Sequence, residues 1–293
     1  MALVFSLNKN AIMIKDVKNL KQRLITSSVM LPLFIFPIYW GGLIYQFFLI
    51  FLSTLIFFEL LLITKHKHGK ISIILYVFFL LISVGLLNYF SYIVCLCIYS
   101  FITFAIIIIN KLKSYKNWLP LSLLISYIPF IILNEVRSEA NFPDGLLLTL
   151  FIIAIAIISD VSGYFGGQIC GKKKIFPYIS PNKTLEGTFF ALIMPSVIIL
   201  PIIIAAHIKL NIYLLFVMII FMSAGAILGD LLASFIKRNF DVKNSSNLLP
   251  GHGGVIDRLD SVIGSSLVFI IMIFIFKIIN LSGIELISVE NLI

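Results

Sequence analysis

Long apolar runs alternate with short polar segments along this chain of 293 residues. A helix needs about 20 apolar residues to cross the hydrocarbon core of a bilayer, and roughly nine runs approach that length. The sixth run is short, and we expect it to extend into the polar stretch that follows. The predicted spans cover residues 24–40, 43–63, 71–88, 91–109, 118–134, 145–159, 187–206, 212–233 and 261–280.

The composition agrees with this pattern. The chain is 60% hydrophobic and 12% charged, with a mean hydropathy of +1.11, which is far more apolar than a soluble domain. The spans leave no room for a separate soluble domain. We therefore predict an all-α polytopic membrane protein with one membrane domain over residues 1–293. Its N-terminal helices would occupy residues 1–134, and its catalytic helices and cytoplasmic loops residues 145–280.

The distribution of positive charge predicts the orientation. The net charge of +9 could indicate nucleic acid binding, but the basic residues follow the spans instead. Of 22 Lys and Arg residues, all but Arg137, Lys209 and Lys277 fall before the first span or after an even-numbered one. This positive-inside pattern places the N-terminus in the cytoplasm and, with nine spans, the C-terminus outside. We expect anionic lipid, and no nucleic acid, at the basic loops.

The second half carries two long cytoplasmic segments rich in Gly, Pro and charge, which we read as loops over residues 159–187 and 234–260. Long loops in a compact domain are often functional. The first half is plainer, and Glu59 is the only acid within its five spans. An acid inside a span is a functional candidate, although Glu59 lies near the cytoplasmic end, where it could simply reach water.

Asp230 lies near the cytoplasmic end of the eighth span, and helical spacing puts Ser234 and Lys237 on the same face. Burying a carboxylate in an apolar span costs several kcal/mol unless it is paired or bound to a metal. Asp230 is therefore either a metal ligand or the partner of Lys237 or of a neighbouring helix.

The segment that precedes the ninth span combines a glycine-rich turn with two acids. Its glycines, Gly253 and Gly254 among them, let backbone N–H groups converge on an anion. Asp257 and Asp260 follow at positions i and i+3, with Arg258 between them. Acids at a helix start also compensate the helix dipole. Two on one face, with Asp230 on the preceding span, favour a divalent cation such as Mg²⁺.

The first polar segment supplies similar groups. Asp160 closes the sixth span, and Lys183 and Thr184 precede an apolar run as a polar lead-in to a helix. Helix starts bind phosphate readily, and ordinary capping by Asn182 or Thr184 is the alternative. The lysines at 172–174 fit either phosphate binding or a topology signal. The three cysteines lack the spacing of a metal site or a disulfide framework.

The string from Ser234 to Asp260 resembles the signature of phosphatidate cytidylyltransferases (CDP-diacylglycerol synthases). The matching residues are Ser234, Lys237, Arg238, Lys243, Pro250, His252, Gly253, Gly254, Asp257, Arg258 and Asp260. The segments SDVSGYFGG and SPNKTLEG, and Glu59 at the end of the second span, also resemble the family. Asn244 departs from it, because the family usually has Asp after the signature lysine.

The resemblance implies the reaction of CTP with phosphatidate to give CDP-diacylglycerol and pyrophosphate at the cytoplasmic face of a bacterial inner membrane. It implies Mg²⁺ on Asp230 and Asp257 with support from Asp160 and Asp260, and it leaves open a second cation and a homodimer. Other implied roles are phosphate neutralisation by Lys237, Arg238 and Arg258, a triphosphate pocket shaped by His252, Gly253 and Gly254, and further contacts from Lys183, Thr184 and Ser234. The alternatives are a CTP-dependent polyprenol kinase and, more distantly, an ion-coupled transporter.

Overall fold

The computed structural model describes residues 26, 28–64, 73–74, 76–82, 118–138, 144–207, 211–249 and 253–281. Within these ranges the chain is helical apart from short connections and two isolated β-bridges. Six of the described helices are long and apolar enough to cross a membrane. They are α2 (Gly42–Ile63), α5 (Leu119–Arg137), α6 (Gly145–Ile169), α7 (Leu185–Ala205), α8 (Ile212–Asn239) and α9 (Ile256–Leu281).

The apolar pattern located these helices well. The predicted spans at 43–63, 118–134, 187–206 and 212–233 each fall on one long helix, and the first span corresponds to a shorter helix, Ser28–Trp40. The predicted span at 91–109 and half of that at 71–88 lie outside the described residues. The polytopic all-α prediction is therefore confirmed in its coarse form, while nine spans and the placement of the termini stay predictions.

The two polar segments were predicted as loops with bounds that are too wide, although the expected extension of the sixth span into the first of them is confirmed. Ser159–Ile169 is the last part of α6, and the connection to α7 covers only residues 170–184. The second segment likewise begins inside α8 and ends inside α9, which leaves residues 240–255 as the connection. Glycine lowers helix propensity, but here the glycines of α6 face α7. A Cβ on Gly187 would lie 2.7 Å from the carbonyl oxygen of Gly163.

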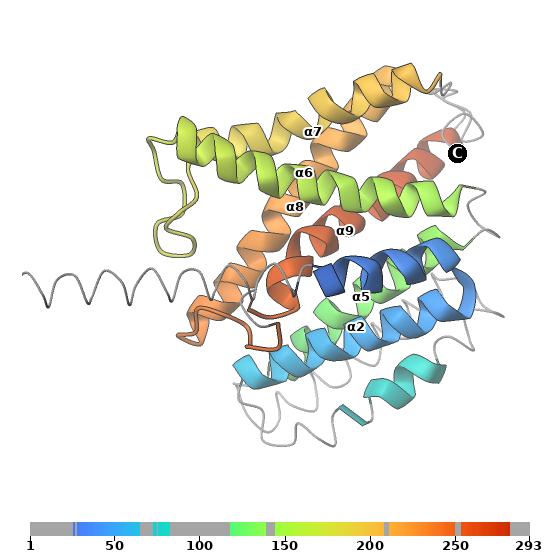
Figure 1. Ribbon diagram of the computed structural model, residues 1–293, viewed down its shortest axis with the longest axis vertical. Coiled ribbons are helices and arrows are strands. Elements are labelled where there is room, and N and C mark those ends of the chain that lie inside the picture. The colour runs from blue at the N-terminus through green and yellow to red at the C-terminus, as the bar shows by residue number, and fades with distance from the viewer. Residues whose placement is uncertain are drawn as a thin grey trace, which may run out of the picture.

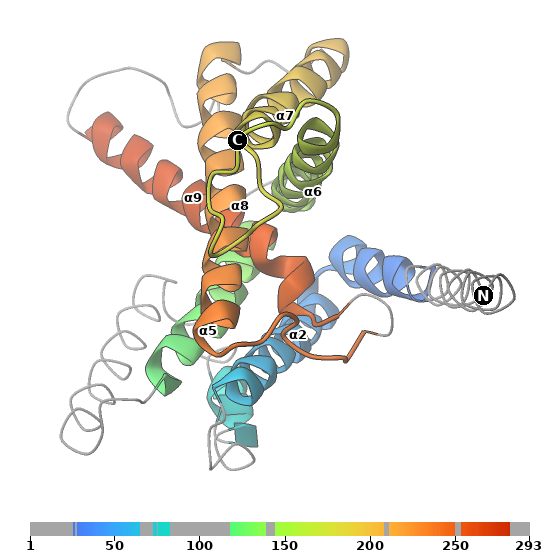
Figure 2. The same ribbon diagram turned by 90° about the vertical axis from the view of Figure 1, so that its left-hand side faces the viewer.

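The helices form two groups that share a centre. α6 packs along α7, and α8 crosses α9, with further contacts from α6 to both α8 and α9 (Figure 1). α2 packs on α5, and α5 also contacts α6 and α9. The view in Figure 2 separates the group of α6, α7 and α8 from that of α2 and α5, with the start of α9 between them.

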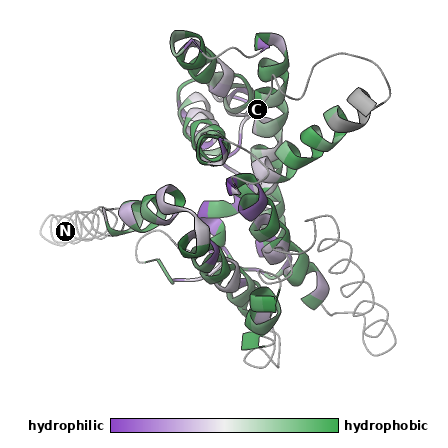
Figure 3. Cartoon of the chain, turned by 90° about the vertical axis from the view of Figure 1, so that its right-hand side faces the viewer, coloured by the Kyte–Doolittle hydropathy of each residue, from purple (hydrophilic) through white to green (hydrophobic). Residues whose placement is uncertain are grey.

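Burial separates interior helices from peripheral ones. In α5, 61% of the most apolar stretch of 18 residues is buried inside the protein, against 22% in α7. α7 therefore presents most of its apolar surface outward, where a bilayer would cover it. Figure 3 shows hydrophobic residues along the outward surfaces of the helices and hydrophilic ones near the centre, where the two groups meet.

The crossing of α8 and α9 is close because small residues face each other. A Cβ on Gly229 would lie only 2.1 Å from the carbonyl oxygen of Asp260, and a Cβ on Gly264 would lie 2.1 Å from that of Gly225. Small residues at such crossings let membrane helices approach backbone to backbone. This contact brings Asp230, the residue after Gly229, beside the first turns of α9.

The chain direction gathers both polar connections at one end of the protein. α6 and α8 end there, and α7 and α9 begin there, so the connections 170–184 and 240–255 lie at the same side of Figure 1. The two helix starts bring their positive dipole ends to this region. An anion would be favoured there on electrostatic grounds alone.

Candidate functional site

A pocket of about 630 Å³ opens where these helix ends meet. Four of the predicted acids line it, and they come from α6, α8 and α9. Asp260 lies within electrostatic reach of both Asp230 and Asp160. The lining residues that carry polar side chains are Ser159, Asp160, Tyr164, Gln168, Lys174, Ser180, Asn182, Lys183, Thr184, Thr188, Asp230, Asp257 and Asp260.

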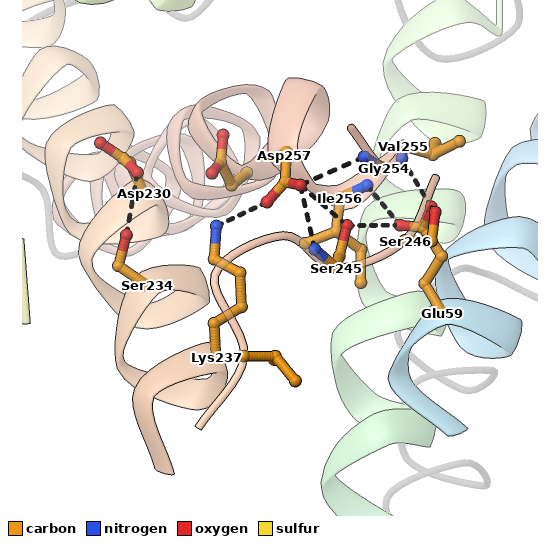
Figure 4. Close-up of polar contacts among 12 residues, drawn as sticks. Glu59, Asp230, Ser234, Lys237, Ser245, Ser246, Gly254, Val255, Ile256 and Asp257 are labelled. Carbon is orange, nitrogen blue, oxygen red and sulfur yellow. Dashed lines mark hydrogen bonds and ion pairs between the residues drawn. The ribbon is translucent and has the colours of Figure 1, made fainter. Parts of the chain in front are cut away.

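Two lysines neutralise two of these acids. Lys183 Nζ lies 2.7 Å from Asp230 Oδ2, and Lys237 Nζ lies 2.5 Å from Asp257 Oδ1. The sequence had offered Lys237 as a partner of Asp230, but Asp230 pairs with Lys183, which precedes α7. Ser234 Oγ also donates to Asp230 Oδ1, at 3.4 Å (Figure 4).

Asp257 is held from two sides. Its Oδ1 accepts from Lys237, while its Oδ2 accepts from the backbone N–H of Ser245 at 3.1 Å, the Ser245 hydroxyl at 3.0 Å and the Gly254 N–H at 3.1 Å (Figure 4). Side chains of Lys237 and Asp257 are only 11% and 14% exposed. The orientation of this carboxylate is therefore fixed by the connection 240–255 as well as by α8.

Glu59 lies behind this connection and is fully buried. Its carboxylate accepts four hydrogen bonds, from the Val255 and Ile256 backbone N–H groups, both at 2.8 Å, and from the Ser245 and Ser246 hydroxyls at 3.1 and 2.5 Å. Glu59 thus caps the start of α9 from α2. Its position near the end of α2 does not expose it to water.

Asp160 and Asp260 are linked through the next residue of α9. The Ser261 hydroxyl donates to Asp160 Oδ1 at 2.7 Å, and the Ser261 N–H donates to Asp260 Oδ1 at 2.9 Å. Asp160 also lies within electrostatic reach of Lys183 and Arg258. Asp160, which lies within α6, therefore joins the acids of α8 and α9.

Thr184 combines capping with a place at the pocket. Its hydroxyl accepts from the Gly187 N–H at 3.1 Å, which makes it the N-cap of α7. Glu186 accepts from the Lys172 and Lys173 N–H groups and so holds the preceding connection. Of the two capping candidates, Asn182 instead lines the pocket.

Other predicted residues lie beside the pocket and do not line it. Arg238 donates to the carbonyl oxygens of Ile179 and Val242, both at 3.3 Å, and thereby ties the two connections together. The Gly254 N–H is bonded to Asp257. Gly253, at φ +87°, is paired with Leu249 through two backbone hydrogen bonds, and Arg258 and Asn244 are exposed. His252 and Pro250 lie outside the described residues.

Several contributors were not recognised from the sequence. Ser245 and Ser246, which link Glu59 to the connection, lie within the string from Ser234 to Asp260 but are not among the residues that match the signature. Tyr164 and Gln168 were assigned to a loop, although they line the pocket from α6. Helical spacing from Asp160 would have placed Tyr164 and Gln168 on the pocket face.

The pocket suits a divalent cation that keeps substrate oxygens in its shell. Among the described residues, no three His, Cys, Asp or Glu side chains come together closely enough to hold a metal alone. Mg²⁺ usually takes one or two carboxylates and completes its shell with phosphates and water. The donor set of Asp160, Asp230, Asp257 and Asp260 fits that requirement. The Ser159 hydroxyl, which lines the pocket, has no hydrogen-bond partner within the described part of the chain.

Comparison with known proteins identifies the family. The profile of the cytidylyltransferase family matches residues 21–276. The phosphatidate cytidylyltransferase of Staphylococcus saprophyticus is 33% identical over 250 residues, which cover 83% of this chain and 94% of that protein. Those of Staphylococcus epidermidis and Staphylococcus aureus are 43% and 38% identical over 136 and 134 residues, which span 46% of this chain and half of theirs. The match extends over most of the chain, and the protein belongs to the cytidylyltransferase family.

Proposed function

We propose that the protein transfers the CMP moiety of CTP to phosphatidate, giving CDP-diacylglycerol and pyrophosphate. The observation that carries this proposal is the pocket in which four carboxylates and Lys183 meet at one end of an apolar helix bundle. The relatives named phosphatidate cytidylyltransferase support the choice of both substrates. A lipid phosphate in a bilayer and a soluble nucleotide can meet only at such an end.

In this reaction an oxygen of the lipid phosphate attacks the α-phosphorus of CTP. The bond from that phosphorus to the oxygen bridging the α- and β-phosphates breaks, and pyrophosphate leaves with its electron pair. Phosphoryl transfer depends mainly on positioning and on neutralisation of charge. Lys183 and Lys237 carry positive charge next to Asp230 and Asp257, and in this proposal they also contact the phosphates.

Asp230 and Asp257, with Asp160 and Asp260 as support, are the residues that would hold Mg²⁺. When bound there, the ion would neutralise charge on the phosphate oxygens. Asp257 is the most firmly oriented of the four, since Lys237, Ser245 and Gly254 together donate four hydrogen bonds to it. The starts of α7 and α9 add positive potential from their dipoles.

Incubation of the purified protein with phosphatidate, Mg²⁺ and CTP tests the proposal. Two separate preparations of CTP, one labelled at the α- and one at the γ-phosphate, identify the bond that breaks. The α-label is expected in a lipid product and the γ-label in pyrophosphate. In parallel reactions with a polyprenol in place of phosphatidate, transfer of the γ-label to the polyprenol, with release of CDP, would instead identify a lipid-alcohol kinase. Labelled lipid from neither preparation would contradict both enzymes.

We further propose that the pocket faces the cytoplasm of a bacterial inner membrane, on the basis of the basic loops. A single cysteine tests this in a variant in which all three native cysteines are replaced. Asn247 is exposed, whereas Ser245 is buried and would react poorly. Asn247→Cys should resist a membrane-impermeant maleimide in intact cells and react in opened ones. Equal reaction in intact cells would overturn the orientation.

A further inference from the structure

Glu59 is a buried acid that the proposed reaction does not use. It lies on α2, four residues before the helix ends, and none of its surface is exposed. It does not line the pocket of the four aspartates. An ionised carboxylate in such a place must have its charge compensated by hydrogen bonds.

The hydrogen bonds of Glu59 are divided evenly between its two oxygens. Oε1 accepts from the Val255 N–H and the Ser246 hydroxyl, and Oε2 accepts from the Ile256 N–H and the Ser245 hydroxyl. The first N–H groups of a helix have no partner within the helix, and a carboxylate there is favourable. This cap comes from another helix, almost 200 residues earlier in the chain: 197 residues separate Glu59 from Ile256.

Ser245 connects this cap to the pocket. Its hydroxyl oxygen lies 3.1 Å from Glu59 Oε2 and 3.0 Å from Asp257 Oδ2, so that its single hydrogen is shared between the two carboxylates. The Ser245 N–H and the Gly254 N–H bind the same oxygen of Asp257. Glu59 therefore holds Ser245 and Val255, which are one of the two backbone donors to Asp257 and the residue next to the other.

The backbone at Gly254 packs closely against the side chains of Ser245 and Glu59. A Cβ on Gly254 would lie 1.7 Å from the Ser245 hydroxyl oxygen and 2.6 Å from Glu59 Oε1. The position therefore requires glycine. Because residues 245 and 254–257 are fixed against Glu59 as one unit, a shift of Glu59 would be transmitted to the Asp257 carboxylate.

We propose that Glu59 is a positioning residue for Asp257. It touches no substrate, and it acts by holding Ser245 and the first turn of α9 so that Asp257 keeps its direction into the pocket. Glu59 would thus give a role in the reaction to the N-terminal helices, whose described residues do not line the pocket. The kinetic consequence of this role rests on the proposed function, but its structural content can be measured separately.

Glu59→Gln is the sharpest test. Each oxygen of Glu59 accepts one backbone N–H, so the amide group of Gln must face a donor whichever way it turns. We expect kcat for CDP-diacylglycerol synthesis to fall about 10²-fold, the loss that a misplacement of about 1 Å can cause. The KM values for CTP and phosphatidate should stay close to those of the wild type, since the pocket keeps its lining.

Ser53→Ala is the matched control. Ser53 is also buried on α2, and its hydroxyl bonds to Tyr76 and to the Ser126 carbonyl, away from the pocket. Loss of this hydroxyl should lower thermal stability without changing kcat per folded molecule. If Glu59→Gln behaves in the same way, with unchanged kcat in the folded fraction, Glu59 is a structural cap only and the proposal is overturned.

A double-mutant cycle tests the route through Ser245. Ser245→Ala removes the bridging hydroxyl, and the combination with Glu59→Gln should lose much less activity than the sum of the two single losses. Ser246→Ala removes a contact to Glu59 but none to Asp257, and it should reduce kcat less than Ser245→Ala does. Additive effects in the cycle would contradict the route.

Hydrogen exchange followed by mass spectrometry separates this proposal from the proposed function. Peptides that contain Val255, Ile256 and Gly254 should be protected in the wild type and exchange faster in Glu59→Gln but not in Ser53→Ala. If the wild type makes no CDP-diacylglycerol, the function is wrong, and faster exchange still supports the positioning contact. Unchanged exchange in Glu59→Gln would overturn it whatever the activity.

Discussion

The two helix groups both bury polar side chains, but they satisfy them in different ways. Between α2 and α5 the groups are neutral: the Ser53 hydroxyl lies 2.6 Å from Tyr76 Oη and donates to the Ser126 carbonyl at 2.7 Å. Around the pocket the groups are charged, and the pair of Lys183 and Asp230 keeps 21% and 34% of its side-chain surface exposed. The first arrangement is closed, and the second is open to a ligand.

A buried charge in the N-terminal group serves packing as well. Arg137 at the end of α5 donates to the carbonyl oxygens of Ile38 and Tyr39, at 2.9 and 3.2 Å, where the helix Ser28–Trp40 ends. A cation is favourable at that end of a helix. Gly41 has φ +71°, a conformation that side chains with a Cβ rarely adopt, which explains the glycine at this turn beside Arg137.

The difference teaches that charge alone does not locate a site. Arg137 and Glu59 are buried and bonded to backbone groups, whereas two of the four pocket aspartates are paired with lysines that a phosphate can compete for. A binding site needs charged groups whose partners a ligand can replace at little cost in free energy. The closed region is the packing between α2 and α5, and the open region is the pocket. Glu59 connects them, because it lies on α2 and contacts Ser245, which binds Asp257.

The largest effect should come from the best-oriented carboxylate of the open region. Asp257→Asn removes its charge and its pairing with Lys237, and we expect activity to fall about 10²–10³-fold, as for the loss of one electrostatic partner at a reacting centre. Turnover with saturating CTP, phosphatidate and Mg²⁺ measures this.

Asp241→Asn is the control for Asp257→Asn. Asp241 lies exposed on the same connection at φ +55°, a conformation that Asn tolerates. It should keep wild-type turnover. Near-normal activity of Asp257→Asn at ordinary Mg²⁺ would remove Asp257 from the site.

A smaller effect is expected at the other ion pair. Lys183→Met leaves Asp230 without its cation. A hydrogen bond to a charged group contributes about 1.5–3 kcal/mol, which corresponds to roughly 10- to 100-fold in kcat/KM for CTP. Steady-state kinetics with varied CTP measure it, and Lys173→Met, exposed on the same connection, is the control. A drop confined to the KM for phosphatidate would place Lys183 at the lipid instead of the nucleotide.

In the closed region the effect should fall on stability alone. Ser53→Ala leaves the buried Tyr76 hydroxyl without this partner, a loss of about 1–3 kcal/mol, while kcat per folded molecule stays unchanged. Thermal unfolding in detergent measures the shift. Thr54→Val is the control, because among the described residues the Thr54 hydroxyl bonds only to Ile50 of its own helix. A loss of turnover in folded Ser53→Ala protein would erase the distinction between the two regions.

The smallest effect is expected at Asn244, where relatives with the family signature usually carry an acid. Its side chain is exposed and does not line the pocket. Asn244→Asp should therefore change kcat/KM by less than about tenfold, or about 1.4 kcal/mol. Titration with Mg²⁺ checks the same point. A larger gain, with a lower Mg²⁺ requirement, would show that residue 244 belongs among the metal ligands.

The sequence by itself determined the helices, the family resemblance and the acids that meet. Apolar runs of membrane length predict helices because the backbone must be hydrogen-bonded within the bilayer. Asp160, Asp230, Asp257 and Asp260 were recognisable because acids are rare next to such runs. All four line the pocket. The helix ends were misplaced where glycines continue α6, since propensity carries no information on a neighbouring helix.

Only the tertiary structure decided which partners these acids have. Asp230 pairs with Lys183 and not with Lys237. Close packing at Gly187 holds the start of α7 against α6, and close packing at Gly229 brings the first turns of α9 to α8, where Asp257 takes Lys237 as its partner. It also gave Glu59 its place: the acid is visible in the sequence, but its four donors come from a connection more than 180 residues away. The spacing of residues along the sequence indicates which of them share a face of one helix. Which side chains pair between helices depends instead on how closely the helix backbones approach each other.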